Sequence, residues 1–169
     1  MGKFISGMVL MKMKKILLLT AAALCAGTIA MARVPNDEGA LGGIVPGMTK
    51  EEVIAIYGAP KEGKVTWAAA WGPHAEAQII GYGDSVTMNC VRDSGRPFRV
   101  TMIHITANNG FSTPSGIHVG STRSEVIGTY GEPDIHYGDA LYYKTDSGVN
   151  LVFHMRTGGV ASMNLGWDA

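Results

Sequence analysis

The strongest constraint on the fold of this chain is an internal repeat. Residues 43–60 align without a gap to residues 116–133, at a constant offset of 73 residues, and ten of the 18 aligned positions are identical. Such similarity between two segments of one chain indicates that the same structural unit occurs twice. We therefore divide this part of the chain into a first repeat at 43–110, a linker at 111–115 and a second repeat at 116–169.

Each copy carries the sequence of a capped helix. The pattern T-x-x-E occurs at Thr49 and Glu52, and again at Thr122 and Glu125. In such a capping box the threonine hydroxyl accepts from the third helical amide, and the glutamate accepts from the N-cap amide. The sequence therefore predicts helices over 50–57 and 123–130, each ended by a glycine with a proline two residues later. These terminating residues are Gly58, Pro60, Gly131 and Pro133.

After each helix the hydrophobic period changes from 3.6 residues to two, which indicates β-strands. The expected strands lie at 77–82, 85–91, 98–106, 140–144, 149–156 and 160–167. Residues 66–71 fit either a further strand or a helical turn. Because one copy is too small to bury its own apolar face, we expect an α+β fold. In it, two tandem helix-plus-antiparallel-strand repeats would share one antiparallel sheet, with both helices on one face.

Residues 1–32 have the organisation of an export signal. Lysines precede an apolar run, and Ala30-Met31-Ala32 places small residues around a cleavage site. Met11 or Met13 is the expected true start. Cleavage after Ala32 would leave 33–42 as an N-terminal linker and predicts a periplasmic or secreted protein. An uncleaved membrane anchor is the alternative, and it would be the chain's only contact with a membrane.

The charge of the remaining chain excludes one class of partner. From Arg33 onward there are ten lysines and arginines against fourteen aspartates and glutamates, so the formal net charge is −4. Nucleic-acid binding depends on clusters of basic residues that neutralise phosphates. We therefore expect no nucleic-acid partner.

The residues that could carry catalysis are not arranged for it. The five histidines show no ligand spacing, and neither a nucleophile elbow nor a phosphate-binding loop occurs. Cys90 alternates with Val86 and Met88, which predicts a buried thiol. We therefore expect no enzyme, no metal site and no cofactor. The alternative is a small-ligand-binding or enzymatic periplasmic domain that uses His118 and His136, which flank the second helix.

A partner-binding surface is predicted on the sheet face that the helices leave open. Neighbouring strand residues point to opposite faces, so Tyr142 and Tyr143 cannot both be buried beneath one layer of helices. If Ile103 and Ile105 face the core, the residue between them lies on the open face. Aromatic and arginine side chains are the usual anchors of protein interfaces. The candidate partner-binding residues are Met102, His104, Tyr142, Tyr143, His154 and Arg156.

The pattern G-x-x-x-G-M-T-x-x-E-V-x-x-x-Y-G-x-P, followed by antiparallel strands, resembles the β-lactamase inhibitor protein-like fold. That group includes the SmpA/OmlA (BamE-like) small outer-membrane-assembly lipoproteins. The resemblance is carried by residues 43–60 and 116–133, and the tandem arrangement is closer to the inhibitor. The chain lacks the lipobox of the lipoproteins and the paired disulfides of the inhibitor. The resemblance implies a non-enzymatic envelope protein that binds a protein partner, in envelope assembly or as an inhibitor of a secreted enzyme.

Overall fold

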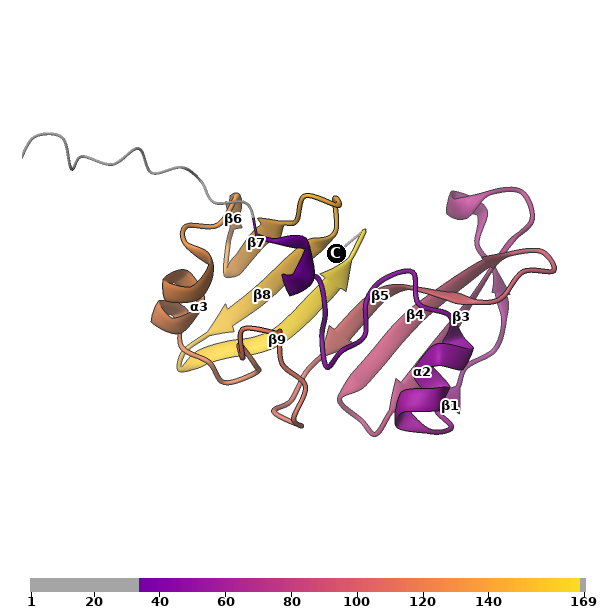
Figure 1. Cartoon of the computed structure of the whole chain (residues 1–169), viewed down its shortest axis with the longest axis horizontal. Helices are drawn as coiled ribbons and strands as arrows, with labels where there is room; N and C mark the ends of the chain where they lie inside the picture. The colour runs from indigo at the N-terminus through magenta and orange to yellow at the C-terminus, as the bar shows by residue number, and fades with distance from the viewer. Residues whose placement is uncertain (1–33, 168–169) are drawn as a thin grey trace, which may run out of the picture. The chain divides into compact units, whose positions relative to one another are not determined.

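The computed structural model describes residues 34–167 (Figure 1). The predicted export signal at 1–32, with its cleavage site and alternative start positions, lies outside the described residues. Within residues 34–167, no helix is both long enough and apolar enough to cross a bilayer.

The two helices have the bounds that their capping boxes predict. Helix α2 comprises Lys50–Tyr57 and helix α3 comprises Arg123–Tyr130. At the start of α2, the Thr49 hydroxyl accepts from the amide of Glu52, and the Glu52 carboxylate accepts from the Thr49 amide at 2.7 Å. Thr122 and Glu125 form the same pair of hydrogen bonds in front of α3.

The helix ends are also confirmed. Gly58 and Gly131 have φ angles of 80° and 77°, a region of the backbone that favours glycine. Pro60 and Pro133 then follow in the chain, where a helix could not continue. The repeated sequence is therefore a repeated helix with its caps.

The strands of residues 34–167 form one nine-stranded antiparallel sheet in the order β1-β3-β4-β5-β9-β8-β7-β6, with β2 paired to β3. The six strands predicted from the alternation occur within two residues of their expected ends, whereas β1 and β6 are too short to show a period. Their bounds are β1 Lys61–Glu62, β2 Thr66–Trp67, β3 Ala75–Tyr82, β4 Val86–Asp93, β5 Arg99–Ile105, β6 Ile135–Tyr137, β7 Ala140–Lys144, β8 Asn150–Arg156 and β9 Gly159–Gly166.

The segment at 66–71 combines both alternatives that its sequence allowed. Thr66–Trp67 is strand β2, and Ala69–Trp71 is the short 3₁₀ helix η2. A second 3₁₀ helix, η1, comprises Asn36–Glu38.

The predicted fold class is wrong. The described chain is 43% strand and only 16% helical, so it is predominantly an antiparallel sheet and not an α+β pair of helix-plus-strand repeats. The helices contribute little because each has only eight residues: α2 buries Val53, and α3 buries Val126 and Tyr130. The sequence expectation gave the repeated helices too much weight relative to the strands that follow them.

The N-terminal segment covers most of the linker expected at 33–42. From Val34 onward it is packed: Val34 forms a parallel bridge with Thr145, and the side chain of Glu38 accepts a hydrogen bond from the hydroxyl of Tyr130 at 2.7 Å. Leu41 is fully buried. In Figure 1 this segment, in indigo, runs beside strands of the C-terminal half. Residues that precede the first copy therefore stabilise the second.

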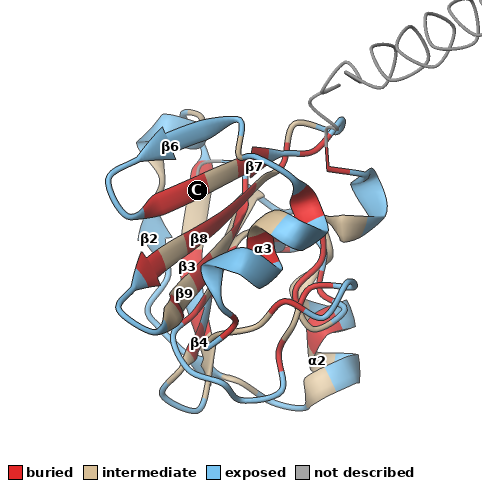
Figure 2. Cartoon of the chain, turned by 90° about the vertical axis from the view of Figure 1, so that its left-hand side faces the viewer, coloured by how far each residue is buried: buried red, intermediate tan, exposed pale blue. Residues whose placement is uncertain are grey.

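A single core lies on the sheet face that carries α2 and α3. It crosses the centre of the sheet where Ile103 and Ile105 on β5 lie opposite Leu165 and Met163 on β9, all fully buried. Figure 2 shows buried residues along the strands and on the inner sides of both helices. Cys90 belongs to this core, as predicted, and burial raises the pKa of its thiol to about 11.

Candidate functional site

The candidate site is the face of the sheet opposite α2 and α3, which we call the open face. Alternation along the strands shows which residues lie on this face. Leu151 and Phe153 on β8 belong to the core, so His154, the next residue, points to the open face. The same argument on each strand places there Ile79, Asn89, Met102, His104, Ile135, Tyr137, Tyr142, Val152, His154, Arg156 and Asn164.

One of the predicted partner-binding residues is not on this face. Tyr143 is 1% exposed, packs against the rings of Tyr130 and Phe153, and donates a hydrogen bond from its hydroxyl to the carbonyl of Gly131 at 3.0 Å. Burial raises the pKa of its hydroxyl to about 12. Tyr143 is therefore a core residue, and the prediction that it contacts a partner is wrong. Its neighbour Tyr142 is the tyrosine on the open face, half-buried.

At the centre of the open face, two histidines are joined through one amide. Nδ1 of His104 on β5 contacts Oδ1 of Asn164 on β9, and Nδ2 of Asn164 lies 3.2 Å from Nε2 of His154 on β8. An amide side chain has one accepting and one donating end. The histidine at the donating end must offer a lone pair, so the intact network requires at least one neutral imidazole whichever way the amide is turned.

The electrostatics of the network agree with this geometry. Burial lowers the pKa of His154, and the neighbouring His104 lowers it further. The two rings line a polar hollow of about 580 Å³ together with Arg156 and Asp139. Three of the predicted residues, His104, His154 and Arg156, are thus brought together around one hollow.

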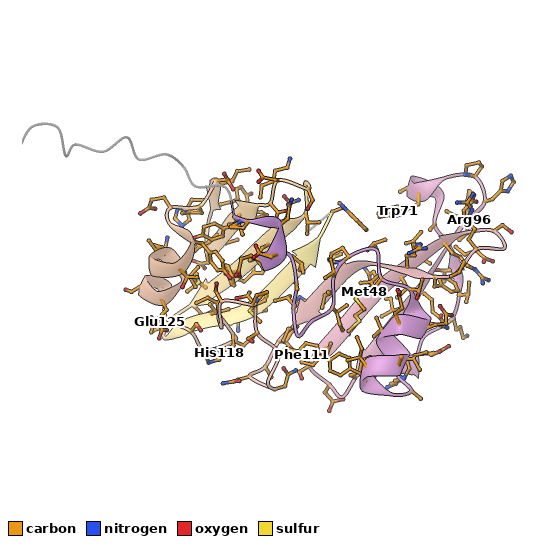
Figure 3. All side chains as sticks on the ribbon, in the orientation of Figure 1. Met48, Trp71, Arg96, Phe111, His118 and Glu125 are labelled. Carbon is orange, nitrogen blue, oxygen red and sulfur yellow. The ribbon has the colours of Figure 1, made fainter. Side chains whose placement is uncertain are left out.

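Met102 belongs to a second, apolar hollow of about 470 Å³, between the open face of β3, β4 and β5 and the segment that contains β2 and η2. The walls include Trp71, Ile79 and Val91. Trp71 also lines a third hollow, of about 290 Å³, together with Arg96 and other residues (Figure 3). The sequence does not predict this part of the site, since only the pairing of β2 with β3 places Trp71 beside the open face.

The histidines of the alternative function are not brought into one site. Nδ1 of His118 lies 3.0 Å from the carbonyl oxygen of Gly116. His136 has a different neighbour, because its Nε2 accepts a hydrogen bond from Arg123 at 2.9 Å. In the described part of the chain, no group of three His, Cys, Asp or Glu side chains is placed to hold a metal ion. This geometry gives no support to a His118–His136 centre.

Asn164 is the most informative residue that sequence reasoning did not select. A signal existed: it lies between the core residues Met163 and Leu165, so alternation alone places it on the open face. What the sequence does not give is the register of β5, β9 and β8. Only that register sets His104 opposite Asn164.

Comparison with protein-family models, with curated proteins and with solved structures gives no match to this chain. The resemblance to the β-lactamase inhibitor protein-like fold therefore stays a prediction, and function has to be argued from the open face itself.

Proposed function

We propose that this chain is an exported, non-enzymatic module that binds a protein partner of the cell envelope, or one outside the cell, through its open face. The observation that carries this proposal is where large hydrophobic side chains remain exposed. Of the nine large hydrophobic side chains that are exposed within residues 34–167, three lie on the open face: Ile79, Ile135 and Tyr137, which are 56%, 61% and 77% exposed. Ile79 lies on β3 towards one edge of the sheet, and Ile135 and Tyr137 lie on β6 at the other, so apolar contacts are available at both ends of this face.

The composition of the face fits a protein interface. Apolar side chains occur towards both edges of the sheet, and the polar row of His104, Asn164 and His154 crosses its centre. In a protein interface, hydrogen-bonding groups placed among apolar anchors give specificity, while the anchors supply most of the binding affinity. Arg156 adds a cationic side chain beside the row, in the same hollow.

The state of the thiol favours binding over covalent catalysis. Reactive cysteines are partly exposed and have lowered pKa values. Cys90 is fully buried on the core side of the sheet, and its pKa is raised to about 11. Its surroundings are those of a structural residue.

The proposal is tested by recovering the full-length chain from its native cells with an antibody and quantifying the proteins that accompany it. A variant with Tyr142→Ala and His154→Ala should lose the main accompanying protein. Ile56→Ala is the control, because Ile56 lies on α2 and is 55% exposed, so it removes an exposed apolar side chain from the other face. Equal recovery by both variants would contradict the proposal.

A further inference from the structure

An apolar hollow lies beside Trp71, between the open face and the segment that contains β2 and η2. It lies between two layers of backbone: β3, β4 and β5 form its floor, and residues 63–72 form its rim. Its volume of about 470 Å³ is within the range of small-molecule sites, which span about 300–1,000 Å³.

The rim is held in place by hydrogen bonds to the sheet. The amide of Gly63 donates to the carbonyl of Ile79 at 2.7 Å, and Nε2 of Gln78 donates to the carbonyl of Gly63 at 3.1 Å. Further along, the amide of Ala68 donates to the carbonyl of Ala75 at 2.9 Å. The hollow is thus formed before any ligand binds, which lowers the conformational entropy that binding would cost.

The lining specifies the chemistry of a ligand. Its apolar part includes Trp71, Ile79 and Met102, of which Trp71 is 46% exposed and Ile79 is 56% exposed. Thr66 and Asn89 add uncharged polar groups at the wall. A ligand that covered these apolar surfaces would remove them from water, which is the main source of affinity in such sites.

The single ionisable residue of this lining is Lys64, and no acidic side chain accompanies it. Lys64 lies on the exposed rim segment between β1 and β2. An anionic group would interact favourably with its ammonium, and a cationic group would be repelled. The charge at the rim therefore distinguishes between ligands with the same apolar body.

We propose that this hollow binds a small amphipathic carboxylate. The apolar body of the ligand lies against Trp71, Ile79 and Met102, and the carboxylate lies beside Nζ of Lys64. The site shares Ile79 and Met102 with the open face, but a small ligand would enter it from solvent and needs no protein partner to bind.

The test uses three probes with straight eight-carbon chains, counting the carboxyl carbon of the first: octanoate, octan-1-ol and octyltrimethylammonium. Binding of each to the full-length chain is measured by calorimetry below the concentration at which the probes form micelles. We expect octanoate to bind most tightly, and the ammonium probe most weakly. An exposed ion pair changes affinity by up to about fivefold, so Lys64→Glu should reverse the order of the two charged probes. Lys144→Glu, on strand β7, makes the same charge change away from the hollow and should leave the order unchanged.

Trp71→Ala should weaken the binding of all three probes by about tenfold, because it removes the largest apolar wall. Trp67→Ala is its control, since Trp67 is 71% exposed and does not line the hollow. Absence of saturable binding of octanoate would overturn the proposal, as would an unchanged order of probes in Lys64→Glu. If no probe binds but Trp71→Ala lowers recovery of a protein partner, the hollow accepts a side chain of that partner and the carboxylate proposal is wrong.

Discussion

Replacing Asn164 with aspartate should reverse the pH dependence that the histidines of the open face give to stability. In the natural chain the pKa of His154 is lowered in the folded state, first by burial and then by His104. Below about pH 6.5, the ordinary histidine value, the unfolded chain therefore binds more protons than the folded one. The free energy of unfolding contributed by this group falls as the pH falls through that range.

In the Asn164→Asp variant, both ends of the side chain accept hydrogen bonds, so both imidazolium rings can donate to it. The pKa of His154 should then be raised in the folded state. A raised value contributes stability that is fully present below the unfolded pKa and is lost as the pH rises through the folded pKa. A rise of about one pKa unit, the low end for a carboxylate neighbour, corresponds to about 1.4 kcal/mol, and partial exposure reduces this to about 1 kcal/mol.

Urea unfolding at about pH 8 and about pH 5.5, on either side of the ordinary histidine pKa of about 6.5, measures the effect, with all buffers at the same ionic strength. On acidification between these two pH values, the free energy of unfolding of the natural chain should fall by roughly 1–2 kcal/mol more than that of Asn164→Asp. Asn150→Asp is the matched control, because it adds the same charge on β8, where the Asn150 side chain donates to the carbonyl of Trp167 at 3.4 Å and not to a histidine. If Asn164→Asp and the natural chain lose equal stability at pH 5.5, the proposed network does not control the protonation of His154.

Three further outcomes follow from the caps, a glycine contact and the buried thiol. Thr49→Ala and Thr122→Ala should each lower the free energy of unfolding by about 1 kcal/mol in urea titrations, and a change near zero at both would contradict the capping boxes. Gly159→Ala should cost at least about 2 kcal/mol in the same titration, because Gly159 has φ +141° and an added Cβ would lie 2.6 Å from the carbonyl oxygen of Ser121. Cys90 should resist iodoacetamide at about pH 8 until urea unfolds the chain, and rapid native labelling, detected by peptide mass spectrometry, would show that the thiol is accessible.

The local structure was predictable because its determinants are local. A capping box and a terminating glycine act within one helix, so Thr49 and Gly58 suffice to define α2. Strands with a clear period, such as Ala140–Lys144, follow from the alternation of buried and exposed residues. Two-residue strands such as Lys61–Glu62 show no period, and the sequence does not predict them.

The candidate site was predictable only in part, because it depends on register and packing between distant segments. Alternation requires that Tyr142 and Tyr143 point to opposite faces of the sheet, but it does not say which of the two is buried. That choice is made by Tyr130 and Phe153, whose rings pack around Tyr143. The link from His104 to His154 requires three strands in one register, and no local pattern contains that information.

The central claim, that the open face binds a protein, is tested most directly by photo-cross-linking in the native cell. A photoreactive amino acid is placed at Ile135 on the open face or at Ile56 on α2, two isoleucines that are 61% and 55% exposed. The account predicts one dominant cross-linked protein from Ile135, absent from Ile56 and lost when Tyr142 is replaced by alanine. The same cross-linked protein from both positions, or a product from Ile56 alone, would contradict it.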